Sequence, residues 1–287
     1  MSLALSDSAA SAARTIADFN FPTPPLAKPA EQTPFVRGEG DAHTVDPNDI
    51  KQDGYGSCAV LSTLHTIARQ DPSVIQDMIQ DNGDGTYTVT FQERVEVLGV
   101  ETPFWKDVEV TVSGPFDGGA ANPGDVGAGG AEVWPAIIEA AYAQQYKAGD
   151  TQYSTGVLPG DVMEAVLGAG ADTVGAGSID AAGMSAKLAD GEAVVAWTPP
   201  FEDANGNPLM TPAQTALINE YGIAGGHAYA VSEIIPAGTS YVDASGTSIV
   251  AAEDIVVLDN PWGSSDVMMP YSDYQTVYGH VSSAPTD

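Results

Sequence analysis

The sequence predicts an α+β fold, with a helix-rich N-terminal part followed by a β-rich C-terminal part. Apolar residues recur at helical spacing in Cys58–Gln70 and again in Ala131–Gln145. From about Thr173 onward the pattern changes to short apolar runs, which are typical of buried strands. Helices and strands are therefore separated along the chain, and this favours α+β over a regularly alternating α/β arrangement.

The individual elements follow from the same periodicities. In the first part we expect helices at Cys58–Gln70, Ser73–Ile79, Ala131–Gln145 and Pro159–Leu167, and strands at Thr86–Phe91, Val95–Leu98 and Lys106–Val112. In the second part we expect strands at Ala193–Trp197, His227–Ile235 and Asp254–Leu258. The segments Ser113–Gly130 and Phe201–Thr211 are polar and rich in turn-forming residues, which predicts loops.

Three regions are expected along the chain. Residues 1–45 are rich in proline, which predicts an extended arm, a linker or a pro-segment, with a short helix over Ser8–Phe19. Residues 46–170 would form a helical lobe, and residues 171–287 a β-rich lobe with a cleft between the two.

Charge excludes several kinds of partner. The chain of 287 residues has 39 acidic and 9 basic residues and a net charge of −30. Nucleic acid is excluded as a partner because there is no cluster of Lys and Arg to neutralise phosphates, and anionic membrane surfaces are excluded for the same reason. The acidic residues are scattered, which is typical of a solvated coat. Such a coat fits a salt-adapted prokaryote as well as ordinary bacterial acidity.

Nothing in the sequence fixes the compartment. There is no run of 18 apolar residues that would span a membrane. The segment Met1–Asp7 lacks the basic start and apolar stretch of a secretory signal. A cytoplasmic and a non-classically exported protein are both compatible with this pattern, and we expect a monomer.

Cys58 is the only cysteine, so it cannot form a disulfide within the chain. It is either a buried small apolar residue or a reactive thiol. It begins an apolar helix, and Gly54 and Gly56 just before it would permit close approach of other groups. A helix N-terminus and a paired imidazolium would both lower the pKa of the thiol and favour the nucleophilic thiolate.

Three further residues complete a candidate catalytic set. His227 follows two glycines and leads an apolar strand, so it could serve as general base. Asn260 comes directly after another strand and could orient the imidazole, and Gln52 could donate its amide to an oxyanion beside the Cys58 N–H. Each signal is weak alone, but the order Gln, Cys, His, Asn on these element types favours a thiol hydrolase.

The remaining histidines lack such a setting. We expect His65, in the middle of a helix, to be a packing residue. His43 lies in the arm and His280 near the end of the sequence, and no Cys/His spacing indicates zinc.

Four motifs of the sequence resemble the calpain-like cysteine proteases. They are Gln52-Asp53-Gly54-Tyr55-Gly56-Ser57-Cys58, Glu132–Ala143 around Trp134, Gly226-His227-Ala228-Tyr229-Ala230-Val231 and Asp259-Asn260-Pro261-Trp262-Gly263. The resemblance covers about residues 46–275 and implies a two-lobed, papain-like protease core. It also implies that Cys58 is the nucleophile, His227 the general base and then acid, Asn260 the orienting residue and Gln52 an oxyanion donor. Trp262 would shield the bond between His227 and Asn260 from water.

The resemblance also implies a calcium site. Asp49 and Glu132 match carboxylates of the family's first calcium site, so calcium is the one cofactor expected, and an organic cofactor is not. The second site of the family has little room here, because only Ser264-Ser265-Asp266 follows the Asn motif. The sequence departs from the family at Asp53, Ser57 and Ala59, which affects the surroundings of the nucleophile but no catalytic atom.

The expected function is a cysteine endopeptidase that hydrolyses peptide bonds of protein or peptide substrates through a thioester, with calcium dependence open. One alternative is a non-catalytic binding module that keeps the cleft, and another is an acyltransferase on the same fold. We expect the substrate pockets to be formed by the loops Ser113–Gly130 and Phe201–Thr211. The sequence of these loops does not indicate which peptide bonds are cleaved.

Overall fold

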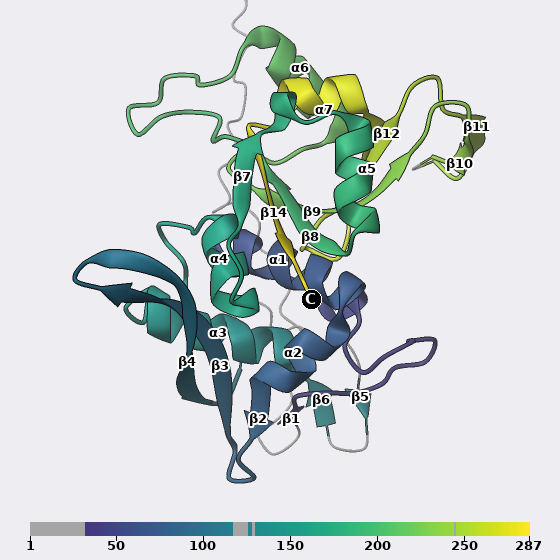
Figure 1. The fold of residues 1–287 in the computed structure, drawn as a ribbon. Helices are drawn as coiled ribbons and strands as arrows, with labels where there is room; N and C mark the ends of the chain where they lie inside the picture. The colour runs from purple at the N-terminus through teal and green to yellow at the C-terminus, as the bar shows by residue number, and fades with distance from the viewer. Residues whose placement is uncertain (1–31, 117–125, 128–129, 244) are drawn as a thin grey trace, which may run out of the picture.

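The computed structural model describes residues 32–116, 126–127, 130–243 and 245–287. The helix expected over Ser8–Phe19 and most of the proline-rich arm lie outside the described residues. Figure 1 shows the arrangement, with the N-terminal helices and a hairpin below and a larger sheet with further helices above. Helices and strands are both abundant, which confirms the α+β class.

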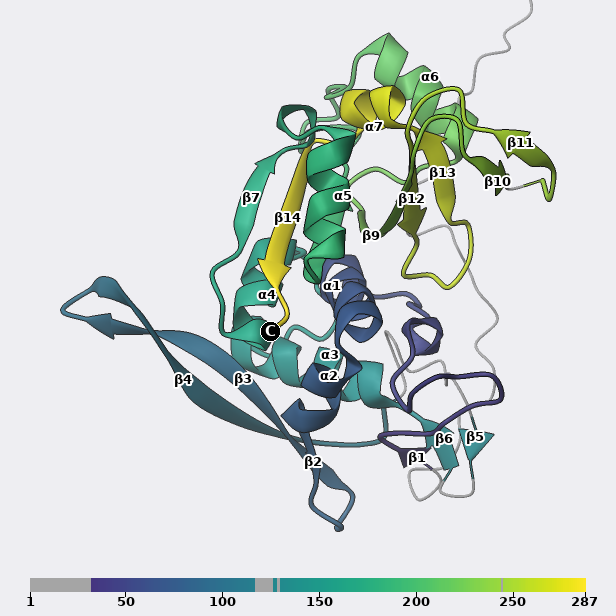
Figure 2. The same cartoon turned by 45° about the vertical axis from the view of Figure 1, so that its right-hand side comes forward.

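The first part of the chain contains four α-helices among its described residues: α1 (Cys58–Gln70), α2 (Pro72–Met78), α3 (Trp134–Tyr146) and α4 (Pro159–Leu167). A short 3-10 helix, η3 (Pro47–Asp49), precedes α1. Strands β2 (Ile79–Asp81), β3 (Thr86–Val97) and β4 (Val100–Ser113) form an antiparallel sheet. The long β3–β4 hairpin extends away from the helices in both views (Figures 1 and 2).

Three short strands lie beside this part. They are β1 (Gln32–Thr33), β5 (Val126–Gly127) and β6 (Gly130–Glu132), in the order β1-β6-β5. The start of the helix expected at Ala131 is therefore strand, and α3 begins only at Trp134. Pro135 explains this boundary, because proline is favoured in the first turn of a helix.

The second part is built on an antiparallel sheet of six strands in the order β13-β12-β9-β8-β14-β7. The strands are β7 (Asp172–Gly175), β8 (Glu192–Trp197), β9 (Ala228–Ile235), β12 (Ile255–Asp259), β13 (Val267–Pro270) and β14 (His280–Pro285). A separate hairpin pairs β10 (Ser240–Val242) with β11 (Ser248–Val250). The helices are α5 (Ala181–Ala189), α6 (Pro212–Tyr221) and α7 (Tyr271–Val277), with the 3-10 helix η4 (Ala176–Ser178).

Strand β8 in the middle of the six-stranded sheet is buried on both faces, and this determines where the helix that begins with Cys58 lies. On β8, Ala193 and Val195 join one hydrophobic core while Val194 and Ala196 join the other. The first core contains the buried residues of α1, α3 and α4, and the second contains those of α5 and α7. Alternation along a strand sends successive side chains to opposite faces, so the continuous apolar run of β8 covers both. Helix α1 consequently lies directly against β8 and β9.

Within the part of the chain that the structure describes, no helix has the length and apolar character needed to cross a membrane.

Candidate active site

Cys58 is the first residue of α1, where backbone N–H groups have no partner within the helix. Ser57 precedes it at the N-cap position, but its side chain makes no capping hydrogen bond. A Cβ on Gly56 would lie 2.7 Å from the carbonyl oxygen of Tyr153, so only glycine allows this approach. Gly54 faces open space, and the expectation that it also permits a close approach is wrong.

The thiol is less acidic than the helix N-terminus suggested. Burial raises the pKa of the Cys58 thiol, while backbone hydrogen bonds from Ala228 and Ala59 oppose the shift. The expected lowering of the thiol pKa is therefore wrong for this arrangement, because removal from water outweighs the helix terminus. The contact with the Ala228 backbone places the sulfur beside the residue that follows His227.

His227 lies just before β9 and is 3% exposed. Gly226, at φ +63°, turns the chain before it, and a Cβ on Gly225 would lie 2.6 Å from the Phe201 ring. Burial lowers the pKa of His227 to about 4, and the hydrogen bond to Asn260 opposes this shift. The imidazole is therefore neutral at pH 7.

Asn260 determines which nitrogen of His227 carries the proton. Its Oδ1 lies 3.0 Å from His227 Nε2 and also accepts a hydrogen bond of 3.2 Å from the Trp262 backbone N–H. Because this oxygen can only accept, Nε2 bears the hydrogen and Nδ1 keeps the lone pair of a base. The ring of Trp262 packs on the imidazole with centroids 4.6 Å apart, and the Tyr229 ring meets it edge-on at 4.8 Å.

Cys58 and His227 line the same cavity, which has a volume of about 960 Å³. No hydrogen bond joins the thiol to the imidazole among the described residues, so the two groups share a cavity without a direct bond. Aromatic side chains line part of it, namely Trp105, Tyr142, Tyr146 and Trp197, and charged side chains line another part, namely Glu93, Arg94, Lys147, Asp161 and Glu164.

The cavity walls differ from the sequence expectation. Residues of the β3–β4 hairpin, α3, α4 and Trp197–Pro200 line the cavity, and none of Phe201–Thr211 does. His280, which was not expected among the site residues, also lines it and stacks on Trp197 with ring centroids 5.2 Å apart. The sequence carried no signal for these walls, because residues of the β3–β4 hairpin, α3 and α4 meet only in the folded chain. Much of Ser113–Gly130 lies outside the described residues.

Gln52 lies in the segment before Cys58 but does not line the cavity. Its side-chain Nε2 donates a hydrogen bond of 2.6 Å to the Tyr55 carbonyl oxygen. Its backbone N–H donates to the Pro261 carbonyl oxygen at 2.7 Å, which ties the segment before α1 to the Asn260 motif.

Asp49 and Glu132 are brought together. They are 2% and 1% exposed, and a side-chain hydrogen bond joins them. Asp49 Oδ2 accepts hydrogen bonds from the Asp46 backbone N–H at 2.7 Å and from Trp134 Nε1 at 2.9 Å, and Glu132 Oε1 accepts one from the Val36 N–H at 2.7 Å. Burial raises the pKa of Asp49 above its ordinary value.

A comparison with protein families identifies the chain. The family model described as calpain family cysteine protease matches residues 39–286. The chain belongs to this family. No curated protein matches the sequence. The matched range includes all four motifs.

Proposed function

We propose that this protein is a cysteine endopeptidase that cleaves peptide bonds through a Cys58 thioester. The observation that carries the proposal is the buried bond between His227 Nε2 and Asn260 Oδ1 beside a cavity that also exposes Cys58. In this arrangement the Nδ1 lone pair of His227 is the base that remains for the thiol.

The mechanism begins from a neutral pair. The pKa of His227 is lowered to about 4 and that of the thiol is raised, so at pH 7 both groups are uncharged. His227 Nδ1 takes the thiol proton as the sulfur attacks the peptide carbonyl carbon, and the sulfur–carbon bond forms. The carbon–nitrogen bond then breaks as His227 returns the proton to the leaving amine. Water, deprotonated by the same imidazole, hydrolyses the thioester and regenerates the thiol.

Two donors would stabilise the oxyanion. The Cys58 backbone N–H is at the start of α1, where it has no helical acceptor. Gln52 would supply the second donor. One of its amide hydrogens is bonded to the Tyr55 carbonyl oxygen, and a primary amide carries a second N–H. Trp262 would keep water away from the bond between His227 and Asn260.

The substrate would lie in a cleft between two lobes. The helical lobe would contribute Cys58 with α3 and α4, and the sheet-bearing lobe would contribute His227 and Trp197. Both sets of residues line the one cavity, which supports this arrangement. The aromatic residues of the lining would suit apolar peptide side chains, and its charged residues Glu93, Arg94, Lys147, Asp161 and Glu164 would suit polar ones.

Calcium is proposed for the buried carboxyl pair. Two carboxyl groups within hydrogen-bonding distance cannot both stay ionised in a dry site unless a cation or a proton compensates them, and oxygen donors suit calcium. Among the described residues no cluster of three or more His, Cys, Asp or Glu could hold a metal. Asp49 and Glu132 would therefore hold calcium only with help from backbone carbonyls and water, because the ion takes about six to eight oxygens. Bound calcium would neutralise the pair and fix η3 against β6.

A non-catalytic binding module is the second candidate. The absence of a bond between Cys58 and His227 favours it, together with the raised pKa of the thiol. In that case the cavity would hold a peptide without cleaving it.

One experiment separates these functions. Casein hydrolysis is measured for the wild type and for Cys58→Ala, with calcium or EDTA and over a range of sodium chloride. We expect hydrolysis by the wild type only, and labelling of Cys58 by iodoacetamide. Equal hydrolysis by both proteins would refute the thioester mechanism, and peptide binding without cleavage under all conditions would favour the binding module. Amine incorporation without cleavage would point to an acyltransferase.

A further inference from the structure

One face of α1 is polar, and its side chains form hydrogen bonds with the six-stranded sheet. Ser62 Oγ donates to the Ala228 carbonyl oxygen of β9 at 2.9 Å, and Thr66 Oγ1 accepts from the Val194 N–H of β8 at 3.1 Å. His65 and Arg69 share this face, because residues three and four apart are neighbours on a helix. The same face begins with Cys58, so the stripe sets where the nucleophile lies over the sheet.

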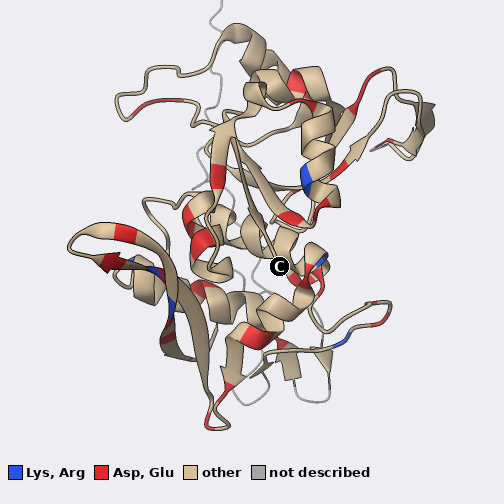
Figure 3. Cartoon of the chain, viewed as in Figure 1, with Lys and Arg blue, Asp and Glu red and all other residues tan. Residues whose placement is uncertain are grey.

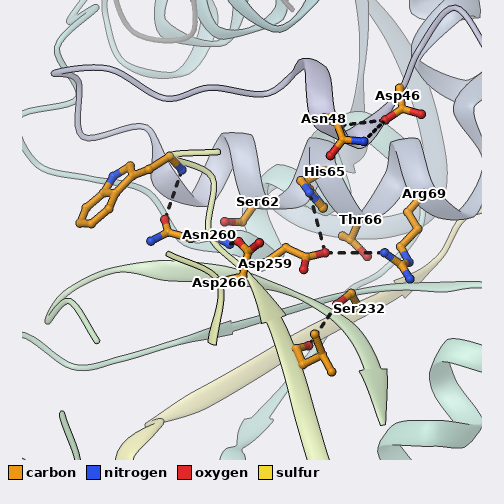
Figure 4. Close-up of polar contacts among 12 residues, drawn as sticks. Asp46, Asn48, Ser62, His65, Thr66, Arg69, Ser232, Asp259, Asn260 and Asp266 are labelled. Atoms are coloured by element: carbon orange, nitrogen blue, oxygen red, sulfur yellow. Dashed lines mark hydrogen bonds and ion pairs between the residues drawn. The ribbon is translucent and has the colours of Figure 1, made fainter. Parts of the chain in front are cut away.

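Asp259 is the point at which this stripe meets β12. Its Oδ2 lies 3.7 Å from Arg69 Nη1 and 3.8 Å from His65 Nε2. Figure 4 shows His65 and Arg69 projecting from α1 toward this carboxylate. On β12, Val256 and Leu258 belong to the core on the far face, so alternation turns Asp259 toward α1.

The neighbour of Asp259 in the chain is Asn260. Asp259 is the last residue of β12, and Asn260 follows it with its side chain on His227. A second carboxylate fixes the backbone of Asn260, because Asp266 Oδ1 accepts a hydrogen bond of 2.9 Å from the Asn260 backbone N–H. The position of Asn260 therefore depends on how the end of β12 is fixed.

The charges around this point come from four segments. Arg69 and His65 belong to α1, Asp259 to β12, Asp266 to the turn after Asn260 and Asp46 to the N-cap of η3. Asp266 and Asp46 both act electrostatically on His65. With His65 neutral, Arg69 is the one cation among these five groups, and it pairs with Asp259. Asp259 is thus the carboxylate that links the cation of α1 to the strand of Asn260.

We propose that Asp259 is a positioning residue for the reaction: by pairing with Arg69 and facing His65 on α1, it fixes where Asn260 and His227 lie relative to Cys58. The inference rests on the proposed peptidase function. Asp259 does not line the cavity, so it acts through Asn260 and not on the substrate.

The test compares Asp259→Ala, Asp259→Glu and Arg69→Ala with the wild type. We expect kcat on a peptide substrate to fall about 10- to 100-fold in Asp259→Ala with KM little changed, because misplacement by about 1 Å has effects of this size. Asp259→Glu should recover part of the rate. The kcat of Arg69→Ala should also fall, but by a smaller factor. This variant provides the test if Asp259→Ala does not fold. Glu192→Gln is the control. It removes a carboxylate of β8 that pairs with Lys187 of α5 and lies away from Asn260.

A second readout separates positioning from stability and from charge. The rate of Cys58 alkylation by iodoacetamide is measured against pH. If Asp259 positions His227, its loss lowers the alkylation rate at pH 7, because the neutral thiol loses the base that takes its proton. A charge effect alone raises this rate, since removing a carboxylate favours a nearby thiolate. An unchanged or higher rate at pH 7, whether or not the melting temperature falls, would overturn the inference.

The two proposals fail in different ways. A wild type that does not cleave peptides contradicts the peptidase function, and the alkylation profile then still decides the role of Asp259. A wild type that cleaves, together with an Asp259→Ala variant as active as Glu192→Gln, contradicts only the positioning role.

Discussion

At the scale of single residues, the most informative atom is Oδ1 of Asn260. It receives the His227 Nε2–H and the Trp262 N–H together, so neither the amide nor the imidazole is free to turn. Fixing the tautomer leaves Nδ1 as the only basic site of the ring. In the proposed mechanism Asn260 would therefore hold a neutral base in one orientation, and it would not supply charge.

This role predicts a loss of rate in Asn260→Ala without a loss of binding. Asn260 is 3% exposed and does not line the cavity, so KM should change little. We expect kcat for peptide hydrolysis to fall about 100-fold, the lower end of what a positioned general acid–base contributes. Asn82→Ala, in the exposed β2–β3 turn, is the matched control and should keep the wild-type rate. A kcat within twofold of wild type would show that Trp262 and Tyr229 alone orient the ring.

The central residues of the site could be predicted from sequence because each has a local signal. Cys58 opens an apolar helix, His227 follows two glycines, and Asn260 precedes Pro-Trp-Gly. Asp259 and Arg69 have no such signal, since their pairing exists only after α1 packs on the sheet. Desolvation of the thiol is likewise a property of the packed structure, and for that reason the direction of the Cys58 pKa shift was predicted wrongly.

At the scale of elements, α1 and α4 begin and end where the periodicity predicted. Helices α5, α6 and α7 were missed within a part expected to be β-rich. Of these, α6 had a readable start, because Thr211 and Gln214 form a capping box around Pro212. Helix α5 had one too, because the Asp180 side chain caps it by accepting from the Gly183 N–H and its sequence is rich in alanine. Helix α7 is short, and its Tyr271, Tyr274 and Val277 are buried in the core beside the sheet, so tertiary packing supports it.

The entry of the chain into α1 gives a prediction at this scale. Gly56→Ala should destabilise the fold by about 1–3 kcal/mol, because its Cβ would lie 2.7 Å from a backbone oxygen that cannot move aside easily. The Gly56 N–H bond to the Gln152 carbonyl oxygen, 3.0 Å long, would be strained as well. Gly54→Ala is the control, since its Cβ would meet nothing within 4 Å. Urea unfolding of both variants measures the difference in the free energy of unfolding. Equal values would mean that the backbone at Tyr153 moves to make room for the added Cβ.

At the scale of the whole molecule, the ionisable groups divide into two populations. Acidic side chains are spread over almost every element of the surface, with few Lys or Arg between them (Figure 3). A small set is buried at the junction of α1 with the sheet, including His65 and His227. Salt screens the first population strongly and the second weakly. The acid response of the buried set should therefore persist at high ionic strength.

His65 allows this acid response to be measured. Burial lowers its pKa to about 4, from an ordinary value of 6.5. Between these pH values the unfolded chain binds the proton and the folded protein does not. The contribution of His65 to the free energy of unfolding therefore falls as pH falls. Asp259, whose pKa is raised to about 6 by burial, acts in the opposite direction below pH 6, so the variant must be compared with wild type at each pH. From pH 7 to pH 5 the free energy of unfolding should fall by roughly 2 kcal/mol less in His65→Gln than in wild type. Urea titrations of both proteins at each pH measure this difference, and an unchanged slope in His65→Gln would mean that other groups bind the protons.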